Sequence, residues 1–130
     1  MSTRVILDAS ATIRILTDPE SAEDLRATIS AAALVMAPAL MLTEVANVIW
    51  KIERAGQLGG TDPLDLLQDA AALVDHLEPD ATLLAEALAL ATHLDHPVYD
   101  CLYLVLARRE VATLVSCDQR LLALAERVLP

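Results

Sequence analysis

Short apolar runs alternate along the chain with longer segments in which apolar residues recur at helical spacing. Three of the short runs, rich in aliphatic residues, predict buried strands at 5–7, 34–36 and 113–116. The remaining segments predict helices at 11–16, 19–30, 38–56, 63–76, 81–94, 99–109 and 119–127. Strands that alternate with helices pack into parallel sheets with both faces covered. We therefore expect an α/β fold, a three-layer α/β/α sandwich around a short, mainly parallel sheet.

The residues at the predicted helix starts are of the types that usually occur there. We expect Ser10 to cap the first helix and Asp80 to cap the fifth, since their side chains can accept hydrogen bonds from free backbone N–H groups. Asp18-Pro19-Glu20 and Asp62-Pro63 each predict a start with proline in the first turn. These signals divide the chain into elements without indicating a linker between domains.

The composition limits the class of protein. The chain has 130 residues, the usual length of one domain, so we expect residues 1–130 to form a single unit. Hydrophobic residues make up 55% of it, which excludes a disordered chain, and two cysteines do not make a disulfide-stapled scaffold. The longest apolar run, 31–42, contains Pro38 and is shorter than the roughly 20 residues that span a membrane. We expect a cytoplasmic protein with no membrane association.

The charge is strongly acidic and unevenly distributed. Nine Lys and Arg against nineteen Asp and Glu give a net charge of −10, which is unusual for a protein that coats nucleic acid. No lysine or arginine occurs in 55–107. A polyanion would therefore have to be contacted by the two groups of basic residues outside that segment, which are Arg4, Arg14, Arg26, Lys51 and Arg54, and Arg108, Arg109, Arg120 and Arg127.

Four carboxylates stand at the ends of apolar elements. Asp8 and Asp118 follow predicted strands, Glu44 is the one acid in an apolar stretch, and Asp100 lies at a predicted helix start. Taken singly, each is explained as a helix cap or a solvated position. Taken together, they could converge at the carboxyl ends of the strands and bind Mg²⁺ or Mn²⁺, which prefer carboxylate oxygens. The pattern alone leaves both interpretations open.

These acids lie in four segments, 5–10 (VILDAS), 42–47 (LTEVAN), 99–107 (YDCLYLVLA) and 114–121 (LVSCDQRL). In these segments the chain resembles the PIN-domain family, and within it the VapC-type toxins of bacterial toxin–antitoxin pairs. The resemblance covers almost the whole chain. It implies a parallel-sheet α/β/α fold and a metal-dependent endoribonuclease that hydrolyses RNA phosphodiester bonds. It also implies the toxin of a type II pair, a small VapB-like antitoxin that inhibits it, and frequent homodimers.

The resemblance also implies roles for individual residues. The family's acidic residues fall on Asp8, Glu44, Asp100 and Asp118, each of which it implies to be a catalytic ligand of Mg²⁺ or Mn²⁺, directly or through water. The histidines have no partners at zinc-ligand spacing, and we expect none of His76, His93 and His96 to act as a general base.

Smaller polar residues near the acids are implied to support them. Ser10, Asn47 and Ser116 fall on positions that would hydrogen-bond the metal ligands and orient them. Cys101 and Cys117 depart from the small residues common in the family at these places. We expect both to be reduced, buried thiols, because the chain is otherwise typical of a cytosolic protein, and a redox-sensitive pair is the alternative.

An acidic protein that cuts RNA needs local basic contacts. We expect these from the basic residues closest to the acids in sequence, which are Arg14, Lys51, Arg54, Arg108, Arg109 and Arg120. Few aromatic residues are available to stack on bases, so stacking would contribute little. A selective enzyme for one folded RNA fits this charge better than a general degrader.

Other functions were weighed against this one. The acidity and the base-free segment 55–107 favour an alternative, a catalytically weak or inactive PIN-fold module that binds RNA or protein. A dehalogenase-like phosphatase needs a second acid two residues after Asp8, where this chain has Ser10. A receiver domain needs an early acidic pair and a late lysine, whereas the one lysine is Lys51. We set these two phosphoryl-transfer proteins aside.

Overall fold

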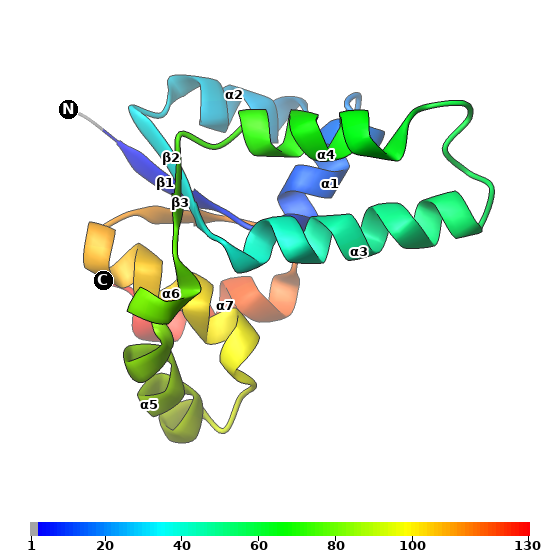
Figure 1. Cartoon of the computed structure of the whole chain (residues 1–130). Helices are drawn as coiled ribbons and strands as arrows, with labels where there is room; N and C mark the ends of the chain where they lie inside the picture. Colours follow the sequence, from blue (N-terminus) through cyan, green and yellow to red (C-terminus); the bar gives the residue numbers. More distant parts are fainter. Residues whose placement is uncertain (1–2) are drawn as a thin grey trace.

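The computed structural model describes residues 3–130 and confirms the three-layer α/β/α fold (Figure 1). Its sheet contains four strands, all parallel, in the order β3-β2-β1-β4. The strands are β1 (Arg4–Leu7), β2 (Leu34–Pro38), β3 (His76–Glu78) and β4 (Thr113–Val115). Because they are parallel, their carboxyl ends lie at one edge of the sheet, where functional groups collect in this class of fold.

Seven α-helices and one 3-10 helix connect and cover these strands within residues 3–130. They are α1 (Ala9–Thr17), α2 (Glu23–Ala31), α3 (Leu40–Arg54), α4 (Pro63–Ala72), η1 (Asp80–Thr82), α5 (Leu84–Leu94), α6 (Val98–Glu110) and α7 (Gln119–Val128). Helices α1, α2 and α4 lie on one side of the sheet, and α5, α6 and α7 on the other (Figure 1). Helix α3 extends beyond the sheet, beside α4. None of the helices in these residues is both long and apolar enough to cross a membrane.

The strands bury alternate residues on opposite faces, as the period of two in a strand requires. Val5 and Leu7 pack in a core with α1 and α2, whereas Ile6 packs in a larger core with α3, α5, α6 and α7. Helix α6 is the centre of the larger core, because every residue of 101–107 is buried. This packing fixes the position of the residues at the start of α6 relative to the ends of β1 and β4.

Strand β3 was not predicted, and the helix expected over 63–76 ends earlier, at Ala72. This edge strand has a single apolar residue between His76 and Glu78, so it carries no recognisable apolar run. Its position is set by pairing with β2: Asp75 donates its N–H to the Val35 carbonyl, and its Oδ2 accepts from the Val35 N–H at 2.8 Å. Contacts between residues 40 positions apart decide this element.

Several predicted helix starts are also corrected. Asp8, rather than Ser10, is the N-cap of α1, and it accepts from the Ala11 N–H. Residues 19–22 form turns, so α2 begins only at Glu23. Asp80 lies in η1 instead of capping α5, and its Oδ1 accepts from Leu40 N–H at the start of α3. The predicted start at Asp62-Pro63 is confirmed, because Asp62 caps α4.

Candidate functional site

The ends of β1 and β4 lie side by side and bring Asp8 next to the segment 116–118. The Asp8 N–H donates to the Val115 carbonyl at 3.1 Å, which joins the two strand ends. Asp8 itself is only 4% exposed. A carboxylate so deeply buried requires several donors, or a cation, to remain ionised.

Asp8 is held by donors on both of its oxygens. Its Oδ1 accepts from Ser10 Oγ at 2.8 Å and from the Ala11 N–H at 2.9 Å, and its Oδ2 accepts from Ser116 Oγ at 2.5 Å. Ser10 Oγ in turn accepts from the Cys117 N–H. Ser116 Oγ accepts from the Asp118 N–H. The two serines therefore hold the Asp8 carboxylate in one orientation and link it to the start of α7.

The ionisation of Asp8 reflects two opposing influences. Burial raises its pKa above the ordinary value of 3.8, and the negative charge of Asp118 raises it further. The hydrogen bonds from Ser116, Ala11 and Ser10 lower it, but the net direction is upward. The hydrogen bonds thus orient the Asp8 carboxylate but do not offset the cost of burying its negative charge. A bound cation would offset that cost.

Glu44 occupies the second turn of α3 and is half-buried beside α6. Its Oε1 accepts from the hydroxyl of Tyr103 at 2.5 Å. Burial raises the Glu44 pKa, the Tyr103 hydrogen bond lowers it, and the charges of Asp100, Asp8 and Asp80 raise it again. Burial and the Glu44 charge also raise the Tyr103 pKa above its ordinary range. The phenol therefore keeps its proton and donates a hydrogen bond to Glu44.

Asp100 lies in the first turn of α6 instead of capping it, because the N-cap is Pro97. Its Oδ2 is 2.7 Å from His96 Nε2, and the His96 side chain is only 7% exposed. His96, for which the sequence indicated no role, is thus in direct contact with a candidate ligand. The available signal was the spacing of four residues, which brings side chains together at a helix start.

The four acids fit a divalent cation in chemistry, although they do not yet enclose one. Within residues 3–130, no three His, Cys, Asp or Glu side chains are close enough to hold a metal as they stand. Two of the acids point toward protein donors, Glu44 toward Tyr103 and Asp100 toward His96. All donors are hard carboxylate oxygens, and Mg²⁺ keeps several waters when it binds such a set. Asp118 is exposed and caps α7, so it lies at the open side of the group.

A groove of about 590 Å³ runs between α1 and α3, and Glu44 is the one of the four acids that lines it. Ser10, Glu44 and Cys117 line the end next to Asp8, and Arg14 lines it farther along α1. Arg14 therefore brings one positive charge to the lining of the groove, which also contains the acid Asp18. The thiol of Cys117 is partly exposed here, whereas Cys101 is buried, which raises its pKa, and both thiols are free.

The other expected contacts are distributed more widely. Arg120 and Lys51 are exposed on the helices that carry Asp118 and Glu44, and Arg54 lies over the Trp50 ring at 5.4 Å. Asn47 is exposed one turn after Glu44, and no hydrogen bond in the described chain joins it to the four acids. Arg108 and Arg109, which were expected to contact RNA, do not lie near the four acids. Both pair with Glu86 near the C-terminal end of α6, about 12 Å along the helix from Asp100 in its first turn.

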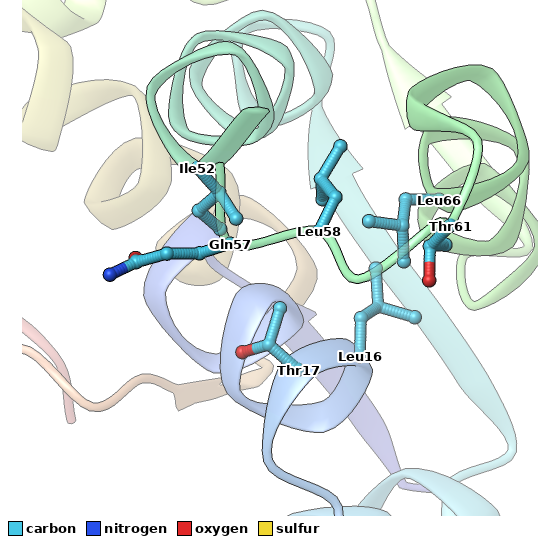
Figure 2. Close-up of a pocket in the computed structure, with 7 residues that line it drawn as sticks. All are labelled: Leu16, Thr17, Ile52, Gln57, Leu58, Thr61 and Leu66. Atoms are coloured by element: carbon cyan, nitrogen blue, oxygen red, sulfur yellow. The ribbon is translucent and has the colours of Figure 1, made fainter. Parts of the chain in front are cut away.

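A second hollow, of about 390 Å³, lies between the ends of α1 and α3 and the start of α4 (Figure 2). Leu16 and Leu66 point toward each other across it, and none of its seven lining residues is acidic or basic. It adjoins the acidic groove, since Thr17 lines both. Its chemistry differs from that of the groove, and it offers no group for acid–base or metal chemistry.

The sequence and the fold of this chain are similar to those of known proteins. The sequence model of the PIN domain family matches residues 5–127. Ribonuclease VapC3 of Pyrobaculum aerophilum is 29% identical over 120 residues, which cover 91% of this chain and 92% of that protein. The crystal structure of PAE2754 from the same organism is similar with a TM-score of 0.71 and 25% identity, covering 95% of this chain and 86% of that one.

Two further solved structures share the fold at lower identity. The toxin VapC20 of Mycobacterium tuberculosis, which cleaves the sarcin–ricin loop, has a TM-score of 0.68 at 18% identity, over 92% of this chain and 94% of that one. VapBC2 of Rickettsia felis, bound to a DNA fragment from its promoter, has a TM-score of 0.67 at 13% identity, over 98% and 96%. At these identities the likeness concerns the architecture.

Proposed function

Because this chain belongs to the PIN domain family, we propose that it is an endoribonuclease that hydrolyses RNA phosphodiester bonds and serves as the toxin of a type II toxin–antitoxin pair. The observation that carries the proposal is the buried Asp8, oriented by two serines at the junction of β1 and β4. The names of the relatives support it, since one is a ribonuclease and another an RNA-cleaving toxin. The function requires the cytoplasm, where the RNA substrate is found.

The proposed cofactor is Mg²⁺ or Mn²⁺, which Asp8, Glu44, Asp100 and Asp118 would hold directly or through water. When bound, such a cation neutralises charge on the phosphate and polarises the attacking water. Asp8 contributes a carboxylate whose orientation Ser10 and Ser116 have already fixed. Preorganisation of this kind limits the entropy lost when the site closes around its ligands.

The chain's own residues also act on the substrate in this proposal. Arg14 would bind an RNA phosphate in the groove that leads to Asp8, and Lys51, Arg54 and Arg120 would extend the contact on either side. Glu44 Oε2, which accepts from no donor within residues 3–130, is the oxygen that would face the cation. With a net charge of −10, the protein would bind only RNA whose shape places several phosphates on these few cations.

A small VapB-like antitoxin is the proposed inhibitory partner, and a homodimer the proposed assembly. An arginine of the antitoxin would pair with the uncompensated acids and thereby compete with metal and RNA. The solved VapBC2 assembly, in which a relative of the same fold occurs with its antitoxin, supports this partner. The uncharged hollow next to the groove, whose lining includes Leu16, Leu58 and Leu66, offers apolar contacts to such a segment.

An inactive binding module is the second candidate. It is favoured by one observation, that no three candidate ligands in residues 3–130 enclose a metal position as they stand. This module would bind RNA or protein without cutting it. The same cleavage assay separates the two candidates.

The test is cleavage of transfer and ribosomal RNA by the purified, antitoxin-free protein in Mg²⁺, Mn²⁺ or EDTA. We expect discrete cuts with metal, no cuts in EDTA and no cuts by Asp100→Asn. Asp69→Asn is the matched control, because Asp69 is an exposed carboxylate on α4, and it should cut like wild type. Equal cutting in EDTA or by Asp100→Asn would contradict the proposed mechanism, and binding without any cutting would support the module.

A further inference from the structure

We propose that Tyr103 is a positioning residue that holds Glu44 in the conformation needed to bind the cation. This inference rests on the proposed function. The chain contains no phenylalanine, and Tyr103, at 2% exposure, is its one buried aromatic residue, since Trp50 and Tyr99 are exposed. A ring needed only to fill the aliphatic core would not need a hydroxyl, and a buried hydroxyl requires a partner.

The partner of that hydroxyl is Glu44, on a different helix. Tyr103 lies in the middle of α6, and its hydroxyl spans the gap to α3 to donate to Glu44 Oε1 at 2.5 Å. The two residues are 59 positions apart in sequence. This hydrogen bond directly links the helix that carries Asp100 to the helix that carries Glu44.

The surroundings of Glu44 explain why such a link is needed. The charges of Asp100, Asp8 and Asp80 all act on Glu44 and repel it. A glutamate has several rotatable bonds, so without a fixed donor it would turn toward solvent and away from the other acids. The Tyr103 hydroxyl occupies Oε1 and leaves Oε2 as the oxygen that can face the cation. Groups that orient a ligand in this way commonly change metal affinity by about 10- to 100-fold when removed.

Tyr103→Phe tests the inference, because it removes only the hydroxyl. Mn²⁺ binding is measured by the electron paramagnetic resonance of free Mn²⁺ in titrations of the whole protein, and RNA cleavage is measured over the same Mn²⁺ range. We expect the Mn²⁺ affinity to fall by about 10- to 100-fold and the Mn²⁺ concentration for half-maximal cleavage to rise by a similar factor. The cleavage rate at saturating Mn²⁺ should change much less.

Val105→Ala is the matched control for a general loosening of the helix. Val105 is buried on α6 two residues after Tyr103, and its truncation weakens the same core without touching Glu44. We expect this variant to melt at a lower temperature while its Mn²⁺ affinity stays at the wild-type value. A loss of Mn²⁺ affinity in Val105→Ala equal to that in Tyr103→Phe would overturn the specific role of the hydroxyl.

A double-mutant cycle with Glu44→Gln shows whether Tyr103 acts through Glu44. In the Glu44→Gln background, Tyr103→Phe should cause almost no further loss of Mn²⁺ affinity. The inference is overturned if folded Tyr103→Phe binds Mn²⁺ like wild type, or if the losses of the two variants multiply. A wild-type protein that neither binds Mn²⁺ nor cuts RNA would instead overturn the proposed function, and this inference with it.

Discussion

Two carboxylates beside α6, Glu86 and Glu44, lie in opposite electrostatic environments. Near the C-terminal end of α6, Glu86 accepts from Arg109 at 3.0 Å and lies 3.5 Å from Arg108, and these arginines lower the Glu86 pKa. Near its N-terminal end, burial and neighbouring acids raise the pKa of Glu44. The surface acid has its own cations, whereas the buried acid is held by a phenol.

The same contrast holds for the whole acidic group. In residues 3–130, no arginine or lysine forms an ion pair with Asp8, Glu44, Asp100 or Asp118, and the one ionisable base in contact is His96. Elsewhere the chain does pair acids with arginine, as in Arg4 with Glu110. A basic side chain among the four acids would occupy the space of a metal ion permanently. Within the described residues their charge is therefore balanced by no arginine or lysine, which is the arrangement that the proposed cation site requires.

Asp8→Asn should have the largest effect, a loss of RNA cleavage in a protein that still folds. Asparagine can still cap α1, so the fold should be retained, but it removes the charge that binds the cation. Loss of several kcal/mol of electrostatic stabilisation in the transition state corresponds to roughly a thousandfold slower RNA cleavage. Single-turnover cleavage rates measure the effect, with circular dichroism to verify folding. A folded variant within a few-fold of the wild-type rate would refute a central role for Asp8.

Added Mn²⁺ should stabilise the protein through the same acids. A ligand at 100 times its Kd stabilises the folded state by about 2.7 kcal/mol, and such a shift raises the melting temperature by several degrees. Asp8→Asn should lose most of this shift, and Glu86→Gln should keep it. Differential scanning calorimetry with and without Mn²⁺ gives both values. A shift of the same size in Asp8→Asn would assign the stabilisation to metal bound elsewhere.

The metal-free protein should lose stability as the pH rises. Asp8 and Glu44 have folded-state pKa values above their ordinary 3.8 and 4.5. At pH values between the ordinary and the raised pKa, the folded chain therefore binds more protons than the unfolded chain. The free energy of unfolding therefore falls as pH rises through the raised values. Melting curves in EDTA should show this fall in wild type, and a smaller one in the Asp8→Asn/Glu44→Gln variant. Identical pH profiles would contradict the raised pKa values.

Glu86→Gln is expected to have the smallest effect. It breaks two exposed ion pairs, with Arg108 and Arg109, and exposed pairs contribute little to stability. We expect a small change in melting temperature and an unchanged cleavage rate. A large loss of cleavage would show that the pair of arginines near this end of α6 acts on RNA, as their place in the sequence had suggested.

The sequence predicted the part of the site that depends on chain order. Asp8 and Asp118 follow apolar strands, and two adjacent parallel strands bring such residues together. Ser10 and Ser116 were likewise expected near the acids, and both donate to Asp8. The placement of Asp8 and Asp118 requires only the strand assignments and a parallel sheet, which are encoded locally, whereas the roles of Ser10 and Ser116 were implied by the family resemblance.

The rest depends on packing between distant elements and was missed. The bond between Tyr103 and Glu44 exists because α6 packs against α3, and nothing in either segment alone indicates it. The contact between His96 and Asp100 was not predicted, because the histidines were examined only as zinc ligands and general bases. Strand β3 has too few apolar residues to be recognised. Arg108 and Arg109 are close to Asp100 in sequence, but a helix carries them away from it.

A crystal of the whole protein soaked in Mn²⁺ shows where the cation binds, because Mn²⁺ can be located by its anomalous scattering. We expect a peak at the carboxyl ends of β1 and β4, in contact with Asp8 and with at least one of Glu44, Asp100 and Asp118, and no such peak in Asp8→Asn. An empty acidic group in a crystal that binds Mn²⁺ at surface acids such as Glu86 would contradict this expectation.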